Sequence, residues 1–458
     1  MRKRSSFVVT TALVLGIVSL GSVPAVSAAD GKAFDLEEAL WYYNDYGVDE
    51  VHAAGITGKG VTIAVLDGAI YAENPLFDGA DIEVQPALCS VLSSDIDEEK
   101  QPATSDSWDA ANHGTGMTTL IVGNGKGGKG APVKGVAPDA KILYFPANHV
   151  FYGTQIDCNR PGIDPNDALA DAMAASIESA LDQGASIISI SYNTGTPTQR
   201  LINVVARANR EGAVIFAGRP NETTVEVDWK SSIDAMNGVV TVQAMARDGS
   251  IQAASAVSDP AIDVVSPGVD VLGDDIDWTG PRYTSGTSPA TPITAAYFAL
   301  AKQKWPDATA AQLVQLMIRT TGRELHEPKK DSNNFIGYGA VSLRGMIDND
   351  PSQLPDDLSP LIVDTAPDLL PEGILFEPIR MRPTTQEIYE PDATVRVDSE
   401  LVAPEVATEA PPLEGVGIAL LAVLLAGVLA LLAVLVVQLR RRPQPIADAA
   451  AHNSLDQQ

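Results

Sequence analysis

Residues 61–67 read Val-Thr-Ile-Ala-Val-Leu-Asp, a nearly continuous apolar run that ends at a carboxylate. Such a run is typical of a strand that is buried on both faces of a parallel sheet. Asp67 would then lie at the carboxyl end of this strand, where open α/β sheets place their functional sites. The stretch therefore predicts a parallel α/β fold and marks Asp67 as a candidate site residue. The alternative for Asp67 is an ordinary Asp-Gly turn.

Two later segments carry a base and a nucleophile. His113 stands in Asn-His-Gly-Thr-Gly before the apolar stretch Met117–Val122, which predicts a helix that begins at the histidine. Ser288 stands in Ser-Gly-Thr-Ser-Pro-Ala-Thr-Pro, and the proline after it favours a helix start, so we expect Ser288 to cap that helix. A plain helix cap is the alternative role for Ser288. An acid, a base and a nucleophile in this order suggest serine-protease chemistry, in which Asp67 orients His113 and His113 activates Ser288.

With these motifs the chain resembles the subtilisin family of serine proteases, whose catalytic residues follow the chain order Asp, His, Ser. Similar motifs extend over residues 56–348, namely Gly58–Val61, Gly135–Pro138, Ser266–Gly268 and Gly337–Gly339. The resemblance implies a three-layer α/β sandwich with a mainly parallel central sheet, and an endopeptidase that works through an acyl-enzyme. It implies no cofactor. Some subtilisins bind structural calcium, but the acidic stretch Asp95–Glu99 matches no metal-ligand pattern, so we assign no metal site.

The sequence departs from the family at the oxyanion position. The family has an Asn donor after the strand that we expect at residues 213–217, whereas this chain has Arg219 there and Asn221 two residues later. We expect one of these side chains to assist the backbone N–H of Ser288 in stabilising the oxyanion. Because Arg219 is long and hard to hold in place, the sequence predicts slow turnover that Arg219→Asn improves.

Ser191, Tyr192 and Asn193 follow an apolar run and resemble the edge along which the family binds substrate. Their backbone is suited to pairing with an extended peptide. A simple exit from strand to loop is the alternative.

Both ends of the sequence carry features of membrane targeting. Residues 1–28 combine basic residues, an apolar stretch and small residues, which predicts a signal peptide. Gly415–Val437 has 23 residues without a charge or amide, inside a predicted transmembrane helix at 413–439. Three arginines follow and predict a cytoplasmic tail at 440–458, with the catalytic domain on the extracytoplasmic side of the cell membrane. A buried core helix is the alternative for the apolar run.

Two segments connect these parts. Residues 29–55 are too short for an independently folding pro-domain and are expected to form an arm packed on the catalytic domain. Residues 349–412 are predicted to be an extended acidic linker, because Pro351–Pro412 contains 11 prolines and 13 acidic residues. This layout resembles mycosins, the subtilisin-like proteases that accompany type VII secretion systems. It implies a secretion-system membrane complex as a partner beside the polypeptide substrate. The alternative function is a weakly active or inactive scaffold that stabilises such a complex.

The formal net charge of -28 makes nucleic acid an unfavourable partner. Cys89 and Cys158 are the only cysteines, and in an exported protein they predict one disulfide. Two buried free thiols are the alternative.

Overall fold

The computed structural model describes residues 33–390 except 94–95, 101–102, 127–129, 147–154, 158–162, 165–166, 195–196, 222–231, 254–257, 275 and 363–381. All of them belong to the first of two compact units, which covers residues 1–393. The predicted signal peptide, transmembrane segment and tail lie outside the described residues. In the part of the chain that is described, no helix has the length and apolar character needed to cross a membrane.

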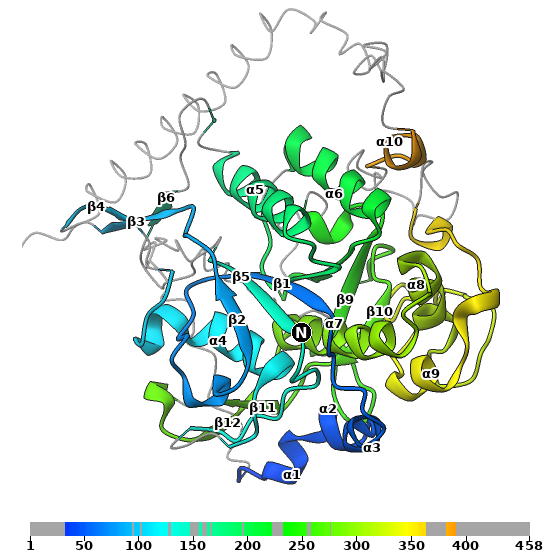
Figure 1. Cartoon of the computed structure of the whole chain (residues 1–458), viewed down its shortest axis with the longest axis horizontal. Helices are drawn as coiled ribbons and strands as arrows, with labels where there is room; N and C mark the ends of the chain where they lie inside the picture. The colour runs from blue at the N-terminus through cyan, green and yellow to red at the C-terminus, as the bar shows by residue number, and fades with distance from the viewer. Residues whose placement is uncertain are drawn as a thin grey trace, which may run out of the picture. The chain divides into compact units, whose positions relative to one another are not determined.

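A seven-stranded parallel sheet forms the centre of this unit (Figure 1), and its strand order is β10-β9-β8-β7-β1-β5-β2. The strands are β1 (Thr62–Asp67), β2 (Asp81–Val84), β5 (Lys141–Pro146), β7 (Ile187–Ile190), β8 (Val214–Gly218), β9 (Val239–Met245) and β10 (Val264–Pro267). The stretch predicted from residues 61–67 is thus an inner strand. Because all strands run the same way, Asp67 lies at the same edge of the sheet as the ends of β7 and β8.

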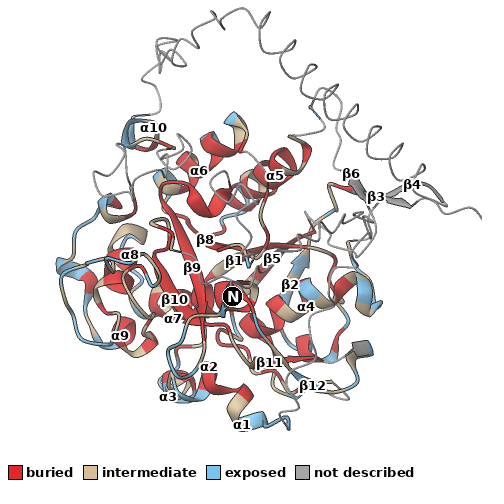
Figure 2. Ribbon diagram, turned by 180° about the vertical axis from the view of Figure 1, so that it is seen from behind, coloured by how far each residue is buried: buried red, intermediate tan, exposed pale blue. Residues whose placement is uncertain are grey.

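Helices cover both faces of the sheet, so the expected three layers are present (Figures 1 and 2). Successive side chains of a strand point to opposite faces. Ile63 and Val65 of β1 therefore pack in one core cluster, whereas Ala64 and Leu66 pack in the other. The first cluster includes residues of α4 (Trp108–Val122), α7 (Thr287–Lys304) and α8 (Ala310–Arg319), and the second those of α5 (Ala168–Asp182) and α6 (Gln199–Glu211).

Smaller elements surround these layers. The antiparallel hairpin of β11 (Val271–Asp274) and β12 (Pro281–Thr284) leads into α7. A second small antiparallel sheet contains β3 (Ser90–Ser93), β4 (Ile96–Lys100) and β6 (Gln155–Asp157). The helix α9 (Leu343–Asp348) and the 3-10 turns η1 (Pro75–Phe77), η3 (Ile233–Ala235) and η5 (Ile276–Trp278) complete the domain.

The segment expected to be an arm forms three short helices, α1 (Leu36–Ala39), α2 (Trp41–Asn44) and α3 (Val48–Ala53). The indole N–H of Trp41 donates to the carbonyl of Val269 at 3.0 Å. Tyr46 stacks on Tyr297 of α7 with 4.9 Å between ring centroids. The segment therefore packs against the helix in which Ser288 lies.

Residues 349–390 differ from the predicted extended linker. The described part contains η6 (Pro351–Gln353), η7 (Ser359–Leu361) and α10 (Thr385–Tyr389). The backbone N–H of Asn237 donates to the carbonyl of Arg382 at 2.9 Å, and Ile388 is fully buried. The prediction is therefore wrong for residues 349–362 and 382–390, because a few apolar and carbonyl anchors fix a segment whose average composition is that of a linker.

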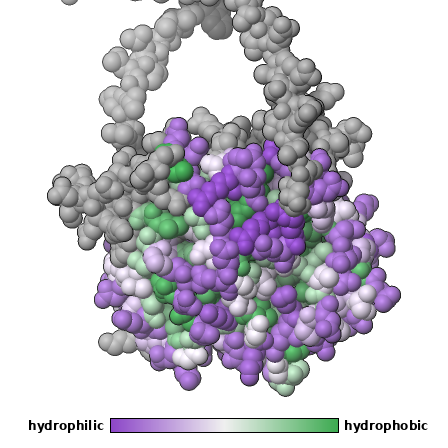
Figure 3. Space-filling model, turned by 45° about the horizontal axis from the view of Figure 1, so that its top comes forward, coloured by the Kyte–Doolittle hydropathy of each residue, from purple (hydrophilic) through white to green (hydrophobic). Residues whose placement is uncertain are grey.

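Cys89 is buried and disulfide-bonded, in agreement with the predicted disulfide, and Cys158 lies outside the described residues. The face drawn in Figure 3 is largely hydrophilic, and its hydrophobic side chains are scattered in small patches. Hydrophobic side chains scattered in this way are normal on a protein surface.

Candidate active site

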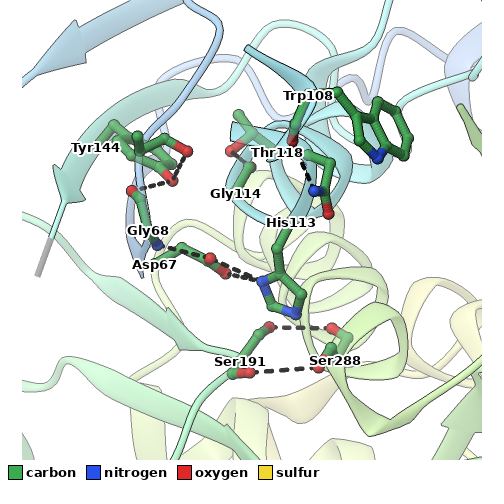
Figure 4. A network of polar contacts seen from close by, with 11 residues as sticks. Asp67, Gly68, Trp108, His113, Gly114, Thr118, Tyr144, Ser191 and Ser288 are labelled. Atoms are coloured by element: carbon green, nitrogen blue, oxygen red, sulfur yellow. Dashed lines mark hydrogen bonds and ion pairs between the residues drawn. The ribbon is translucent and has the colours of Figure 1, made fainter. Parts of the chain in front are cut away.

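Asp67 and His113 meet at the carboxyl edge of the sheet. Asp67 ends β1, and its side chain is 4% exposed. Nδ1 of His113 lies 2.7 Å from Oδ1 and 2.9 Å from Oδ2 of Asp67, while the backbone N–H of Gly68 donates to Oδ1 at 2.7 Å. A carboxylate at Nδ1 favours the tautomer with the proton on that nitrogen. The acceptor nitrogen, Nε2, then points toward Ser191 and Ser288 (Figure 4).

His113 lies in the second turn of α4 and not at its start, so the predicted helix boundary is wrong. Residues 108–112, Trp-Asp-Ala-Ala-Asn, extend the helix, because alanine favours helix and the acidic Asp109 suits its first turn. Gly114 permits a close approach to β5, since a Cβ there would lie 1.8 Å from the hydroxyl oxygen of Tyr144. The missing side chain thus lets α4 hold His113 against Asp67.

The charge of Asp67 controls the basicity of His113. Desolvation lowers the pKa of His113, but the Coulombic attraction and the hydrogen bond of Asp67 together raise it, and the net pKa is above its ordinary value. The imidazole side chain remains 46% exposed, so it is accessible to a ligand. The pair is therefore suited to accept and hold a proton near neutral pH.

Ser288 is the second residue of α7, and Gly286 is the N-cap. The prediction that Ser288 itself caps the helix is wrong, but its N–H still lies in the first turn, where backbone N–H groups lack acceptors within the helix. The Ser288 hydroxyl donates to the carbonyl of Ser191 at 3.3 Å, and the Ser191 hydroxyl donates to the carbonyl of Ser288 at 3.0 Å (Figure 4). The Ser288 proton must therefore turn toward Nε2 of His113 before the hydroxyl is activated.

Arg219 follows β8, as predicted, but its guanidinium points into the protein. Its Nε lies 3.1 Å from Oδ2 of Asp259, and its Nη1 lies 3.9 Å from Oδ2 of Asp234. The Arg219 side chain is 2% exposed, and both carboxylates are fully buried. A buried guanidinium needs such partners because it has lost its hydration. The interpretation of Arg219 as an oxyanion donor therefore disagrees with its placement.

Asn221, the second candidate donor, lies beside the start of α7. Its Oδ1 accepts the backbone N–H of Thr287 at 3.0 Å. This contact fixes the orientation of the amide, because an N–H must face an oxygen. A Cβ on Gly286 would lie 3.6 Å from Nδ2 of Asn221, and Asn221 itself is exposed. The amide therefore lies beside Gly286 and Thr287, the residues that begin α7 and precede Ser288.

The three residues of the expected substrate edge point in different directions. Ser191 contacts Ser288, whereas Tyr192 is 8% exposed and packs in the second core cluster. Burial and the charge of Asp67 raise the pKa of Tyr192. The side chain of Asn193 accepts the hydroxyl proton of Ser232 at 2.8 Å. This alternation is that of an extended segment, although β7 itself ends at Ile190.

Several polar residues that support the site were not predicted. Thr287 contacts both Arg219 and Asn221, Ser232 contacts Asn193, and the Tyr144 hydroxyl donates to the carbonyl of Gly68 at 2.9 Å. These contacts join residues 39 to 76 positions apart in the sequence, so a short motif does not reveal the contacts even where, as for Thr287, it includes one of the residues.

No group of three or more His, Cys, Asp or Glu side chains is arranged to hold a metal ion among the described residues. The acidic stretch Asp95–Glu99 is only partly inside that set.

The sequence profile of the subtilase family, Peptidase_S8, matches residues 58–339, which is more than half of the chain. The chain belongs to the subtilase family. This subtilase is 29% identical to the thermostable alkaline protease of Halalkalibacterium halodurans over 305 residues, which cover 66% of this chain and 73% of the relative. It is 24% identical to mycosin-1 of Mycobacterium tuberculosis over 385 residues, which cover 72% and 79% of the two chains. The family and these relatives identify it as a subtilisin-like serine endopeptidase that is related to mycosins.

Two solved structures share the fold of this subtilase. MycP1 from the ESX-1 type VII secretion system has a TM-score of 0.52 at 21% identity, covering 69% of this chain and 88% of that chain. Fervidolysin from Fervidobacterium pennivorans also has a TM-score of 0.52, at 22% identity, covering 70% of this chain and 47% of that chain.

Proposed function

We propose that this subtilase cleaves peptide bonds through Asp67, His113 and Ser288. The single observation that carries the proposal is the pair of short contacts between Nδ1 of His113 and the Asp67 carboxylate, with Nε2 directed toward Ser288 (Figure 4). Ser288 Oγ attacks the scissile carbonyl carbon while Nε2 takes the hydroxyl proton. His113 then gives that proton to the leaving amine, and water hydrolyses the acyl-enzyme by the same route. Asp67 stabilises the imidazolium that forms in each step.

The oxyanion of the tetrahedral intermediate is held by the backbone N–H of Ser288 and the side-chain amide of Asn221. Two observations support this assignment. The N–H belongs to the first turn of α7, where the helix supplies no acceptor, and the amide is oriented beside it through Thr287. A neutral amide at this position adds a donor without a buried charge. The peptide itself binds in an extended form along Ser191–Asn193.

The active unit works outside the cytoplasm and is attached to the cell membrane by residues 413–439. The signal peptide of residues 1–28 and the basic residues after the apolar run support this arrangement. Mycosin-1 is a relative, and the MycP1 structure belongs to a type VII secretion system. We therefore infer a membrane-bound secretion complex as the setting of this endopeptidase.

Covalent labelling tests the chemistry. A fluorophosphonate should label the full chain, and Ser288→Ala and His113→Ala should each remove most of the label. Ser285→Ala is the matched control, because Ser285 lies three residues away and contacts Asp270 instead. Its labelling should equal that of the unchanged protein. A folded protein that does not label would favour the alternative, a scaffold without catalytic activity.

Protease protection tests the location. Protease added to intact cells should release the domain, while an epitope tag after residue 458 stays protected behind the membrane. Digestion of that tag in sealed cells would contradict the proposed orientation.

A further inference from the structure

The buried guanidinium of Arg219 joins two segments that are far apart in the sequence. Asp234 belongs to η3, and Asp259 precedes β10. Both carboxylates are 0% exposed and lie within 4 Å of the guanidinium. Removing one partner of a buried ion pair is strongly destabilising, whereas replacing the whole group with apolar residues is often neutral. The strong dependence on partners fixes where the Arg219 side chain can point, and hence how the backbone turns after β8.

Both Arg219 and Asn221, at the two ends of this turn, contact Thr287, the residue before Ser288. The backbone N–H of Arg219 donates to the carbonyl of Val242 at 2.9 Å, and its own carbonyl lies 2.5 Å from the Thr287 hydroxyl. Two residues later, Oδ1 of Asn221 accepts the Thr287 N–H at 3.0 Å. The tripeptide Arg219–Asn221 therefore bridges from the buried ion pair to the start of α7. Its inner end is charged and buried, and its outer end is an exposed amide.

The segment that contains Asp234 also contacts the expected substrate edge, Ser191–Asn193. The Asp234 carbonyl accepts the hydroxyl of Thr241, and two residues before Asp234 the Ser232 hydroxyl donates to the side chain of Asn193 at 2.8 Å. The segment that pairs with Arg219 thus also holds the end of the Ser191–Asn193 edge. A shift of the guanidinium would be transmitted to both sides of Ser288.

We propose that Arg219 is a positioning residue that sets the Asn221 amide at the oxyanion site. It occupies the position at which the sequence pattern expects the amide donor, turns inward onto Asp234 and Asp259, and moves the donor two residues along the chain. Arg219 touches no substrate in this arrangement and acts through Asn221. The inference rests on the proposed peptidase function and deepens it.

A double-mutant cycle between Arg219→Met and Asn221→Ala tests this coupling on the full chain. Loss of one oxyanion donor typically lowers kcat about 100- to 1000-fold, and we expect Asn221→Ala to fall in that range. Arg219→Met should lower kcat by a substantial part of the same factor, about tenfold or more, with KM little changed. The double variant should be no slower than Asn221→Ala. Effects that multiply in the double variant would overturn the proposal.

Arg200→Met is the matched control, because Arg200 also pairs with a buried carboxylate, that of Asp171 at 2.9 Å, and the two residues belong to α6 and α5 rather than to the turn after β8. It should lower the melting temperature and leave kcat unchanged. If kcat falls equally in the control and in Arg219→Met, then Arg219 has only a general stabilising role, and the proposal is overturned. If Arg219→Met does not fold, Arg219→Met with Asp259→Asn restores the net charge that Arg219, Asp234 and Asp259 carry together in the unchanged protein, and this variant is used in the same cycle. Fluorophosphonate labelling of the unchanged protein separates the two failures: absent labelling contradicts the peptidase function, and labelling with a multiplicative cycle contradicts only the role of Arg219.

Discussion

The two halves of the site are held in place in different ways. The base half, Asp67 and His113, depends on direct contacts between the end of β1 and the second turn of α4. The donor half, Arg219 and Asn221, depends on partners from η3, the segment before β10 and the start of α7. The base half therefore depends on the chemistry of two side chains that touch each other. In the proposed arrangement, this distributed set of contacts places the donor two residues later in the chain than the family pattern expects.

The sharpest test of the base half is Asp67→Asn. It should lower kcat by about 10⁴-fold, because an amide at Nδ1 favours the wrong tautomer and cannot stabilise the imidazolium. Single-turnover kinetics on a peptide ester would measure the loss. Asp139→Asn is the control, since Asp139 is exposed and accepts from Thr57 instead. A loss under tenfold would show that His113 does not depend on this carboxylate.

For Arg219→Asn in the donor half, the structure predicts slower turnover, whereas the sequence predicts faster turnover. An Asn at residue 219 leaves Asp234 and Asp259 without the guanidinium, which should lower the unfolding free energy by about 3–5 kcal/mol. We also expect kcat to fall, because the Asn221 amide loses its support. Chemical denaturation and kcat on the same preparation check both. A higher kcat with an unchanged unfolding free energy would contradict the contrast drawn between the two halves.

Gly114 tests how closely the base half is packed. Gly114→Ala would place a Cβ 1.8 Å from the Tyr144 hydroxyl oxygen and 2.7 Å from the carbonyl of Ala69, so we expect about 1–3 kcal/mol of destabilisation and reduced labelling of Ser288. Gly116→Ala lies two residues along the same helix with nothing within 4 Å of its Cβ. That control should be neutral or stabilising by up to about 1 kcal/mol, since alanine favours helix. Equal melting temperatures for the two variants would contradict the packing argument.

The smallest expected effect is in the pH profile. A general base must be neutral, so activity falls as the pH drops through the pKa of His113. Asp67 raises that pKa, and the acid limb of kcat/KM should therefore lie above the ordinary histidine value of about 6.5. In Asp67→Asn only the desolvation remains, so an NMR titration of His113 should move below that value. An unchanged pKa of His113 in this variant would mean that a group other than Asp67 raises it.

The sequence predicted the base half because its residues lie inside short, informative segments. A buried apolar run fixes the end of β1, and glycine after His113 indicates the close approach that Gly114 makes to Tyr144. The start of α4 was misplaced because residues 108–112 have no hydrophobic period that separates helix from loop. The inward turn of Arg219 was not predictable, since its partners lie 15 and 40 residues later and neither stands in a motif.

The contact between Tyr46 and Tyr297 has a consequence for where the protein can be divided. The family profile matches residues 58–339, but the packed unit also includes the helices α1–α3 before them and η6, η7 and α10 after them. A fragment cut at the limits of the family match would uncover the fully buried ring of Tyr297 on the helix in which Ser288 lies. Uncovering a large buried side chain costs roughly 1.5–3 kcal/mol, in proteins whose total stability is about 5–15 kcal/mol. A fragment limited to the family match is therefore expected to be less stable than the packed unit.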